Sequence, residues 1–387
     1  MSWPLVQLID ICDTTQGVQI TKDNTSAKPY DGGYRYLYIA DFLRDNKLSY
    51  IDDKFDHKKV TINDLVMANT GSPGKVFKGK DGILSNNLFK ISFNQEIVDR
   101  DYLYFVLSSE EFQYILQSQM KGGIQKHLGH KTISQQVIPL PPLETQKQIA
   151  AVLEKADQLR KDCQQMEQEL NSLVQSVFID MFGDPVTNPK GWDVGIIGEM
   201  LSSANYGTSE KSSTEKKKFP VLRMNNITYE GNWDFSALKY MDMSKEDENK
   251  YLVKSGDILF NRTNSKELVG KTAVYREATS MAYAGYLVRA RCNELAHPDY
   301  ISSFMNSKYG KKTLQSMCKS IVGMANINAK EFQKIKIAKP PVELQEKFAI
   351  RIAAIRTKVA DVKQQEAEYN LLFNALMQKA FKGELNL

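Results

Sequence analysis

Two lysine-bearing glycine loops are the segments whose residue types and spacing come closest to chemistry. Residues 265–272 read Ser-Lys-Glu-Leu-Val-Gly-Lys-Thr, which ends like the loop that wraps the phosphates of a nucleotide. That loop needs glycine where Ser265 stands, so that backbone amides can surround the phosphates. The related loop 69–76 has Asn69 at this place and Val76 where a hydroxyl would hold Mg²⁺. The pattern argues against nucleotide hydrolysis and favours a loop that offers amide, guanidinium and ammonium donors to a nucleic acid.

Two histidines have a spacing that could serve a metal. His127 and His130 lie three residues apart, but no carboxylate or cysteine accompanies them at ligand spacing, and the second half of the chain has Asn326 and Ala329 at these places. A polar, basic loop is therefore the better interpretation. The sequence also lacks a nuclease-like Pro-Asp followed by Glu-x-Lys, a G-x-G-x-x-G after a strand, and a recognisable nucleophile motif. We expect a reader or an adaptor rather than an enzyme.

The composition is that of a globular protein with a small positive charge. The 387 residues include 51 Lys and Arg against 46 Asp and Glu, a net charge of +5, and 42% are hydrophobic. This length predicts two or three domains of about 100–200 residues each. No apolar run approaches the roughly 20 residues that span a bilayer, and residues 1–5 lack the features of an export signal. The four cysteines are far apart in the sequence and suit reduced thiols better than a set of disulfides. We therefore expect a cytoplasmic protein without a membrane contact.

The chain repeats one plan at a spacing that grows from about 185 to 199 residues. Each copy opens with a Trp, at 3 and at 192, followed by a strand-like segment. Three later pairs of segments share strand-like or helix-starting patterns: 36–42 with 221–227, 64–70 with 257–263, and 101–103 with 299–301. The sequence therefore predicts a tandem duplication of one mixed α/β domain.

The two copies close with segments that match without a gap at an offset of 199, from Pro141 to Phe182 and from Pro340 to Phe381. Paired prolines end what precedes and free a helix to begin. Residues 143–182 contain neither Gly nor Pro, so about 40 residues at 1.5 Å each predict a helix of roughly 60 Å.

Apolar residues recur in this segment every three and four positions, which is a heptad pattern that requires a partner. They are Ile149, Val152, Ala156, Leu159, Cys163, Met166, Leu170, Leu173 and Val177. The closing segment of the second copy has the same rhythm. We expect the two helices to pair with each other, with self-association of two molecules and packing against the globular domains as the alternatives.

The positive charge lies outside the two helical segments. The whole chain carries +5 and the helical segments together −2, so the globular parts carry +7. Two positively charged lobes joined by a rigid rod would make two contacts with one extended anion. Scattered surface lysine is the alternative explanation of so modest a charge.

Several segments are more distinctive than the periodicity. They are NYGTS at 205–209, VLRMNNI at 221–227, DILFNRTN at 257–264, VGK at 269–271, IPLPP at 138–142 with Gln146 and Ile149 after it, MFGDP at 181–185 and QKAFKGEL at 378–385. Together with the duplicated order of domain, double proline and long helix, they resemble the DNA-specificity subunit of a type I restriction-modification system over essentially the full chain. The first copy departs from the pattern at Asn69, where the second has Arg262.

The resemblance implies an α+β fold with two tandem-duplicated mixed α/β target-recognition domains, separated by two long antiparallel helices that form a coiled-coil spacer. The expected parts are 1–142 (target-recognition domain 1), 143–185 (spacer helix 1), 186–341 (target-recognition domain 2) and 342–387 (spacer helix 2). It implies that each domain reads one half of a bipartite DNA site, and that the helices set the spacing as a ruler would and dock the methyltransferase subunits.

The same resemblance implies the partners. They are double-stranded DNA and two modification subunits, which carry the adenine-N6 methyltransferase chemistry and bind S-adenosylmethionine. A restriction subunit that uses ATP and Mg²⁺ can join such a complex. No cofactor, metal or catalytic residue is expected on this chain.

The residues expected at these contacts fall into two sets. The DNA contacts expected in the loops are Asn69, Thr70, Ser72, Lys75, Lys126, His127, Asn225, Asn226, Arg262, Thr263, Asn264 and Lys271. Each could instead stabilise its own loop, since Asn, Ser and Thr commonly bond their own turns. The subunit-docking residues expected on the helices are Gln146, Ile149, Phe182, Gln345 and Phe381.

Two other functions remain open from the sequence. One is an autonomous sequence-specific DNA-binding or architectural protein without enzymatic partners, which would bind its site tightly alone. The other is an unrecognised nuclease, which metal-dependent cleavage by the isolated chain would reveal.

Overall fold

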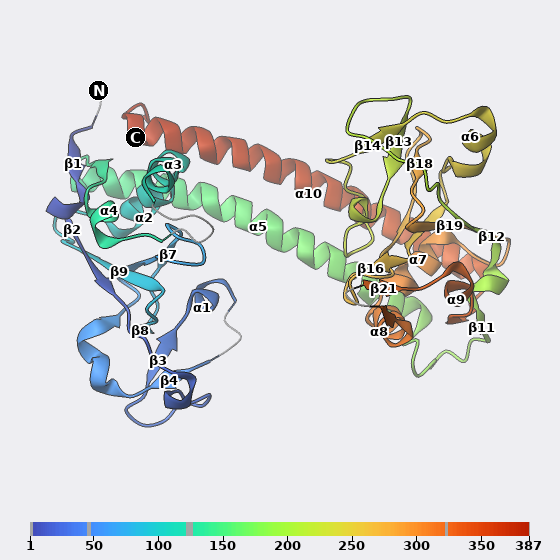
Figure 1. Cartoon of the computed structure of the whole chain (residues 1–387), viewed down its shortest axis with the longest axis horizontal. Coiled ribbons are helices and arrows are strands. Elements are labelled where there is room, and N and C mark those ends of the chain that lie inside the picture. The colour runs from blue at the N-terminus through green and yellow to red at the C-terminus, as the bar shows by residue number, and fades with distance from the viewer. Residues whose placement is uncertain (1–2, 45–47, 121–126, 322–323, 387) are drawn as a thin grey trace. The chain divides into compact units, whose positions relative to one another are not determined.

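The two segments without proline form single helices, as predicted. They are α5 (Leu143–Phe182) and α10 (Val342–Lys382) in the computed structural model, which describes residues 3–44, 48–120, 127–321 and 324–386 (Figure 1). Each helix starts after a proline pair, where the missing N–H groups cost nothing because a first turn has no acceptors for them. Each is followed by a glycine at positive φ, Gly183 at +85° and Gly383 at +77°, which lets the chain leave the helix axis. Within the described part of the chain, no helix is both long and apolar enough to cross a membrane.

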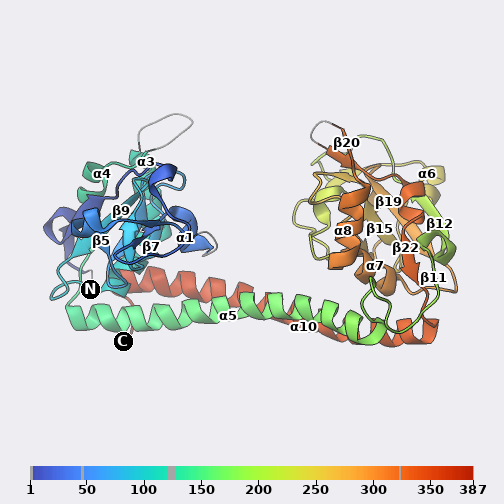
Figure 2. The same cartoon turned by 90° about the horizontal axis from the view of Figure 1, so that it is seen from below.

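The chain forms two compact units whose boundaries fall inside both long helices. Unit 1 contains Met1–Cys163 and Gln365–Leu387, and unit 2 contains Gln164–Gln364. Each unit therefore holds one globular domain together with one segment of α5 and one segment of α10. Within each unit the helix segments lie along one side of the globular domain (Figure 2).

Unit 1 contains two four-stranded sheets and a separate strand pair. The antiparallel sheet has the order β2 (Cys12–Gln16), β9 (Leu88–Phe93), β6 (Leu65–Ala68), β7 (Val76–Lys78). The second sheet has the order β4 (Tyr50–Ile51), β3 (Tyr34–Leu37), β8 (Gly82–Leu84), β5 (Lys59–Val60), and the separate pair is β1 (Leu5–Gln7) with β10 (Val137–Pro139). The shorter helices are α1 (Ile39–Leu43), α2 (Arg100–Ser108), α3 (Glu110–Gln119) and α4 (His130–Ser134).

Unit 2 repeats the antiparallel sheet and the separate strand pair of unit 1, but its second sheet has three strands and it has a further sheet of three strands. Its antiparallel sheet has the order β12 (Leu201–Tyr206), β19 (Leu287–Cys292), β15 (Ile258–Asn261), β17 (Thr272–Val274). The other strands are β14 (Lys239–Met241), β13 (Phe219–Leu222) and β18 (Ala282–Tyr283) in one sheet, β16 (Thr263–Asn264), β21 (Met324–Asn326) and β20 (Lys319–Ile321) in another, and the pair β11 (Val194–Ile196) with β22 (Lys336–Ala338). The shorter helices are α6 (Lys245–Tyr251), α7 (Pro298–Asn306), α8 (Lys308–Met317) and α9 (Ala329–Gln333).

The strand pairings confirm the predicted duplication. The sheet order β2–β9–β6–β7 of unit 1 matches β12–β19–β15–β17 of unit 2, and all its pairings are antiparallel. The parallel pair β3–β8 matches the parallel pair β13–β18, and β1–β10 matches β11–β22. The same mixed α/β domain therefore occurs twice in the chain, and long helices accompany each copy.

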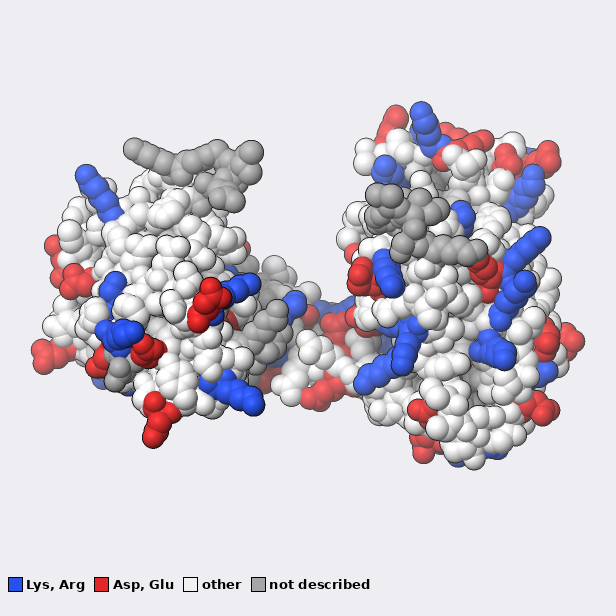
Figure 3. Space-filling model, turned by 60° about the horizontal axis from the view of Figure 1, so that its bottom comes forward, with Lys and Arg blue, Asp and Glu red and all other residues white. Residues whose placement is uncertain are grey.

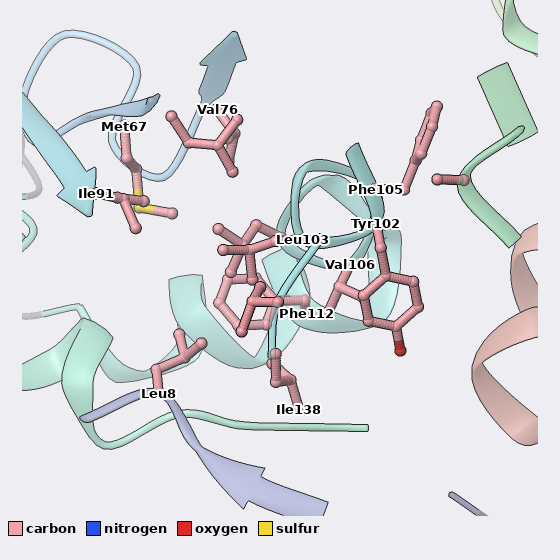
Figure 4. Close-up of a cluster of buried hydrophobic side chains, with 14 of the residues drawn as sticks. Leu8, Met67, Val76, Ile91, Tyr102, Leu103, Phe105, Val106, Phe112 and Ile138 are labelled. Carbon is pink, nitrogen blue, oxygen red and sulfur yellow. The ribbon is translucent and has the colours of Figure 1, made fainter. Parts of the chain in front are cut away.

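A fully buried strand forms the middle of each unit because both of its faces are covered. In β6, Leu65 and Met67 belong to the core that includes residues of α2 and α3, and Figure 4 shows Met67 in this core. Val66 and Ala68 belong to the core on the opposite side. In β15, Ile258 and Phe260 point to the helix side and Leu259 to the other. The helices and the second sheet thus cover opposite faces of the four-stranded antiparallel sheet, and the loops at its strand ends are not covered by either of them.

The long helices use their apolar faces for two contacts at once. In unit 1, Ile149 and Leu153 of α5 share a core with Phe373 and Met377 of α10 and with the globular domain. In unit 2, Phe178 and Phe182 of α5 pack on Phe348 of α10 and on Tyr300 of α7. Pairing with each other and packing against the globular domain, which were alternatives at the sequence level, therefore both occur. As a result the predicted heptad seam is only partly buried: Met166 is 50% exposed.

A buried glutamine joins each long helix to its globular domain. In unit 1 the Gln146 amide donates to the carbonyl oxygens of Ile97 (2.9 Å) and Pro141 (2.8 Å), and its oxygen accepts from the Asp99 N–H (2.9 Å). In unit 2, Gln345 makes the same three bonds, to Leu295, Pro340 and His297. Both side chains are fully buried. We call this arrangement the glutamine joint.

Ion pairs reinforce the joint with different residues in the two units. In unit 1, Lys78 bridges Asp101 of α2 (2.7 Å) and Glu154 of α5 (2.9 Å). In unit 2, Asp299 of α7 accepts from both Arg276 and Arg356, the latter on α10. Burial alone would raise the pKa of Asp101, but its hydrogen bonds to Arg100 and Lys78 outweigh this and lower it. The anchoring of domain to helix is thus common to both units, whereas the charged partners differ.

All five residues predicted to dock other subunits lie at these joints. Gln146, Ile149, Phe182 and Gln345 are buried, and the ring of Phe381 lies 5.9 Å from that of Tyr102. Each holds a helix to a globular domain within one unit. Direct contact of the four buried side chains with another subunit would require them to leave this core.

The segments 36–42 and 221–227 are shorter as strands than predicted. Strand β3 ends at Leu37, because the Asp41 carboxylate accepts from the Tyr38 N–H (2.8 Å) and from Arg35 (3.0 Å) and starts helix α1. In unit 2 the amide oxygen of Asn226 accepts from the Arg223 N–H (2.9 Å) and starts a short 3₁₀ turn. Local side-chain bonds of this kind compete with strand pairing.

Replacing Gln146 by Ala tests the joint. We expect the free energy of unfolding of unit 1 to fall by about 3 kcal/mol, because two carbonyls and one N–H would lose their buried partner. The matched control is Gln148→Ala, two residues along and exposed, for which we expect a change within about 0.5 kcal/mol. Urea unfolding of both variants measures the difference, and equal stabilities would refute the role of the joint.

Candidate nucleic-acid interface

The loop between β6 and β7 presents polar side chains at the open edge of unit 1. Its turn is closed by the Gly74 N–H, which donates to the Ala68 oxygen (2.8 Å), and Gly74 has a φ of +91°. A Cβ at this position would meet the Gln113 side chain at 2.9 Å. The positive φ is what favours glycine here, because the atom that a Cβ would meet is the flexible end of the Gln113 side chain.

A cavity of about 1230 Å³ lies between this loop and α3. It brings together four of the predicted DNA contacts: Thr70, Ser72, Lys75 and His127. The other lining residues are Gly71, Pro73, Val76, Asn87, Tyr104, Ser108, Gln113, Gln117 and Met120. None of these described lining residues is acidic, so an anion would meet no carboxylate there. Lys126, also predicted as a contact, lies outside the described residues.

Asn69 faces the protein rather than the cavity. It is 1% exposed, and its amide donates to the Asn86 oxygen (2.9 Å). Its backbone N–H donates to the Asn87 oxygen and its oxygen accepts from the Leu128 N–H. Asn69 therefore fixes two neighbouring segments to the strand end, and its side chain is not free for a base.

The same backbone position in unit 2 carries Arg262. Its N–H donates to the Tyr286 oxygen (3.0 Å) and its oxygen accepts from the Ile327 N–H (2.9 Å), as in Asn69. Its guanidinium donates to the Asn326 side chain (3.2 Å) and lies over the Tyr206 ring, 5.0 Å from the centroid. These contacts orient a half-buried planar donor, the group that recognises guanine edges or phosphates in two parallel bonds.

Asn326 and Tyr206, which hold Arg262, were not predicted as site residues. Asn326 could have been found from the sequence, because it aligns with the predicted contact His127. In the structure the residue after each of them donates its N–H to the oxygen of Asn69 or Arg262. Tyr206 lies in one of the distinctive segments, but its distance from Arg262 in sequence hid the contact. Because the imidazole of His127 is exposed and Asn326 is bound to Arg262, the two units use this position differently.

The other predicted contacts of the β15–β17 loop are held within unit 2. Thr263 is buried, and its N–H lies 3.4 Å from the Asn261 oxygen. The Asn264 side chain accepts from the Ser265 N–H (2.9 Å). The Lys271 ammonium donates to the Ile227 oxygen, and burial lowers its pKa, with Glu230 opposing the shift.

The neighbouring residues Asn225 and Asn226 differ in the same way. Asn225 is exposed and available to a ligand, whereas Asn226 is 2% exposed and its amide donates to the Asp234 oxygen (2.9 Å). Asn226 also holds the turn at Arg223. One of the two is therefore a surface residue and the other a structural one.

The positive charge is confined to one of the two domains, which corrects the expectation of two positively charged lobes. Residues 186–341 contain 24 Lys and Arg against 16 Asp and Glu, whereas residues 1–142 contain 16 of each. On the face shown in Figure 3, Lys and Arg are spread over much of unit 2, whereas those of unit 1 lie mostly around an uncharged area. Any binding of a polyanion by unit 1 therefore depends on local groups rather than on net charge.

The histidine pair lies in different surroundings. His127 lines the cavity, whereas the His130 ring lies 2.6 Å from the Thr14 hydroxyl and packs on Phe89, where burial lowers its pKa. Across the described ranges, no three His, Cys, Asp or Glu residues come together as metal ligands.

Comparisons with known proteins agree with this geometry. The family model described as "Type I restriction modification DNA specificity domain" matches residues 2–172 and again 189–370. The type I restriction enzyme EcoKI specificity subunit of Escherichia coli is 23% identical over 99% of this chain and 89% of its own length. The MjaVIII specificity subunit of Methanocaldococcus jannaschii is 26% identical over 92% of this chain and 85% of its own length.

Solved structures share the fold. The type I restriction-modification S subunit of M. genitalium superposes with a TM-score of 0.59 at 15% identity, covering 98% of this chain and 96% of that one. A chain from a study of type I restriction-modification complex assembly gives 0.56 at 19% identity, covering 99% and 98%. The two-unit organisation of this chain is therefore shared over whole chains.

Asn226→Ala and Asn225→Ala form a matched pair that tests which asparagine is structural. We expect Asn226→Ala to lower the free energy of unfolding of unit 2 by about 1–3 kcal/mol, because the Asp234 carbonyl and the Arg223 N–H lose their partner. For Asn225→Ala we expect a change within about 0.5 kcal/mol. Thermal and urea unfolding distinguish the two, and a larger loss at Asn225 would contradict the assignment.

Proposed function

This chain belongs to the family of type I restriction-modification DNA specificity domains, and we propose on that basis that it is the DNA-reading subunit of such a complex. In this proposal unit 1 reads one half of a bipartite site and unit 2 reads the other. The catalytic steps belong to partner subunits. The alternative of an autonomous DNA-binding protein finds no support in the EcoKI and MjaVIII relatives, which are named as specificity subunits.

One observation carries the proposal: the family model matches twice, once over residues of each globular domain. A duplicated domain whose loops have diverged suits a DNA site with two different halves. Direct reading requires side chains that reach base edges, with other groups on the phosphates. Arg262 of unit 2 and the cavity of unit 1 both lie where a loop leaves one of the equivalent strands, β15 or β6.

The long helices have two roles in this proposal. Their length sets the number of base pairs between the half-sites, since a continuous helix has a fixed rise per residue. They also offer exposed apolar residues for partner subunits, among them Val152 and Leu371 in unit 1 and Ile350 in unit 2. These replace the buried joint residues as the surface that a docked subunit would meet.

The expected partners are two modification subunits with adenine-N6 methyltransferase activity, and in complexes that cleave DNA a restriction subunit. S-adenosylmethionine and ATP with Mg²⁺ would bind those partners and not this chain. We place the complex in the cytoplasm, where it would meet its DNA.

Mapping N6-methyladenine by single-molecule sequencing tests the function. Cells that contain the modification subunit and this chain are compared with cells from which this chain is deleted. We expect a split motif whose methylation disappears on deletion and returns when the gene is restored. The same methylation in both strains, with this chain purifying alone, would contradict the proposal and favour an autonomous binder.

A further inference from the structure

The two glycine-lysine loops place their lysines in opposite surroundings. Lys75 and Lys271 are equivalent, because each follows the glycine whose N–H closes the turn onto the preceding strand. Lys75 is exposed, and its ammonium lies 5.7 Å from the Phe77 ring centroid. In the described part of unit 1 the Lys75 ammonium makes no hydrogen bond or ion pair, and only the backbone of this residue is hydrogen-bonded. The Lys271 ammonium is instead bound to the Ile227 oxygen.

In unit 2 a second lysine binds the same segment as Lys271. Lys311 of α8 donates to the Tyr229 oxygen (2.9 Å), and burial lowers its pKa to about 8, with Glu230 opposing the shift. The segment after Ile227 is thus held by two ammonium groups. The α3 residue equivalent to Lys311 is Gln113, since both stand four residues after the Ser that caps the helix. Gln113 donates to Gly74 and Leu107 within unit 1.

The β6–β7 loop offers donors that suit a phosphate better than a base edge, namely the ammonium of Lys75 and the short hydroxyls of Thr70 and Ser72. The Thr70 hydroxyl also lies 3.3 Å from the side-chain oxygen of Asn69. The other donors that line the cavity come from other segments and are the imidazole of His127, the hydroxyls of Tyr104 and Ser108, and the amides of Asn87, Gln113 and Gln117. An ammonium is a compact point charge without the planar fork that recognises a base in two parallel bonds. Hydroxyl and ammonium donors are typical contacts to backbone phosphates.

The charge around the cavity also favours an anion. None of its described lining residues is acidic, although residues 1–142 as a whole carry as many Asp and Glu as Lys and Arg. The cavity between the globular domain and the helices in the same unit is different, since Glu110, Glu111 and Asp157 line it. The absence of carboxylates is thus a property of the β6–β7 loop site.

We propose that the β6–β7 cavity of unit 1 binds a phosphodiester group of the DNA backbone through Lys75, with Thr70, Ser72 and His127 as further donors, and that the equivalent Lys271 of unit 2 makes no such contact. The inference rests on the proposed function and adds to it which loop grips the backbone independently of sequence. Unit 2, which carries the positive charge of the chain, binds phosphates through other residues.

Matched Lys→Met variants test the inference, because methionine keeps the length of the stem and removes the charge. The complex with its modification subunits is assembled with each variant, and its affinity for a duplex that contains the mapped site is measured from 50 to 300 mM salt, a range of about sixfold. For Lys75→Met we expect a plot of log affinity against log salt that is less steep by about 1, and an unchanged methylated motif. For Lys271→Met we expect the slope of the unaltered complex together with a lower melting temperature.

A slope for Lys75→Met equal to that of the unaltered complex would overturn the inference, and so would an equal loss of slope for Lys271→Met. A changed methylated motif for Lys75→Met would also overturn it, since it would assign Lys75 to a base.

A second measurement uses the unaltered protein. Single phosphates of the duplex are replaced by uncharged methylphosphonates, and we expect one replacement in the half-site of unit 1 to weaken binding by the unaltered complex but not by Lys75→Met. Equal weakening of both proteins at every phosphate would refute the contact. If the unaltered complex shows no preference for its site, the proposed function fails and the inference falls with it. A failure confined to the Lys75 comparisons leaves the proposed function intact.

Discussion

The glutamine joint is the constraint on which the arrangement of each unit depends. A single buried amide, Gln146 or Gln345, satisfies two carbonyls and one N–H where the long helix leaves the paired prolines. A buried polar group is costly unless all its bonds are made, so this joint admits few alternative geometries. In unit 1 Tyr102 packs on Phe381 of α10, and in unit 2 Tyr300 packs on Phe182 of α5. These ring contacts add buried area between the globular domain and the other long helix. The loops at the far ends of the strands are thereby fixed relative to the helices of their own unit.

The joint is the same in both units, but the loops that it positions have diverged. Asn69 is part of the protein interior, whereas Arg262 at the same backbone position is oriented by Asn326 and Tyr206. The two loop lysines differ in the opposite sense, since the Lys75 ammonium has no hydrogen bond or ion pair among the described residues whereas that of Lys271 donates to the Ile227 oxygen. A rigid scaffold with variable loops is the general solution by which one fold reads many ligands. In this chain two copies of one scaffold carry two different loops.

The sequence predicted the elements with strong periodic signals and missed those that depend on single bonds. The absence of Gly and Pro predicted α5 to its last residue, and the repeated segments predicted the duplication. The strand over 36–42 was predicted too long, because the Tyr38 N–H donates to the Asp41 carboxylate and this local bond starts a helix where the alternating pattern predicts a strand. Residue type alone also could not separate Asn225 from Asn226, or Lys75 from Lys271. Whether such a side chain faces solvent or a carbonyl is decided by segments far away in the sequence.

The central claim, one unit for one half-site, is tested most directly by exchanging a single domain. Residues 186–341 would be replaced by the corresponding domain of the E. coli EcoKI specificity subunit, with both long helices kept, and the methylated motif would be mapped beside those of the two parent proteins. The account predicts a hybrid motif, in which one half is that of this chain and the other half is that of the donor. A motif in which both halves change, or neither does, would contradict it.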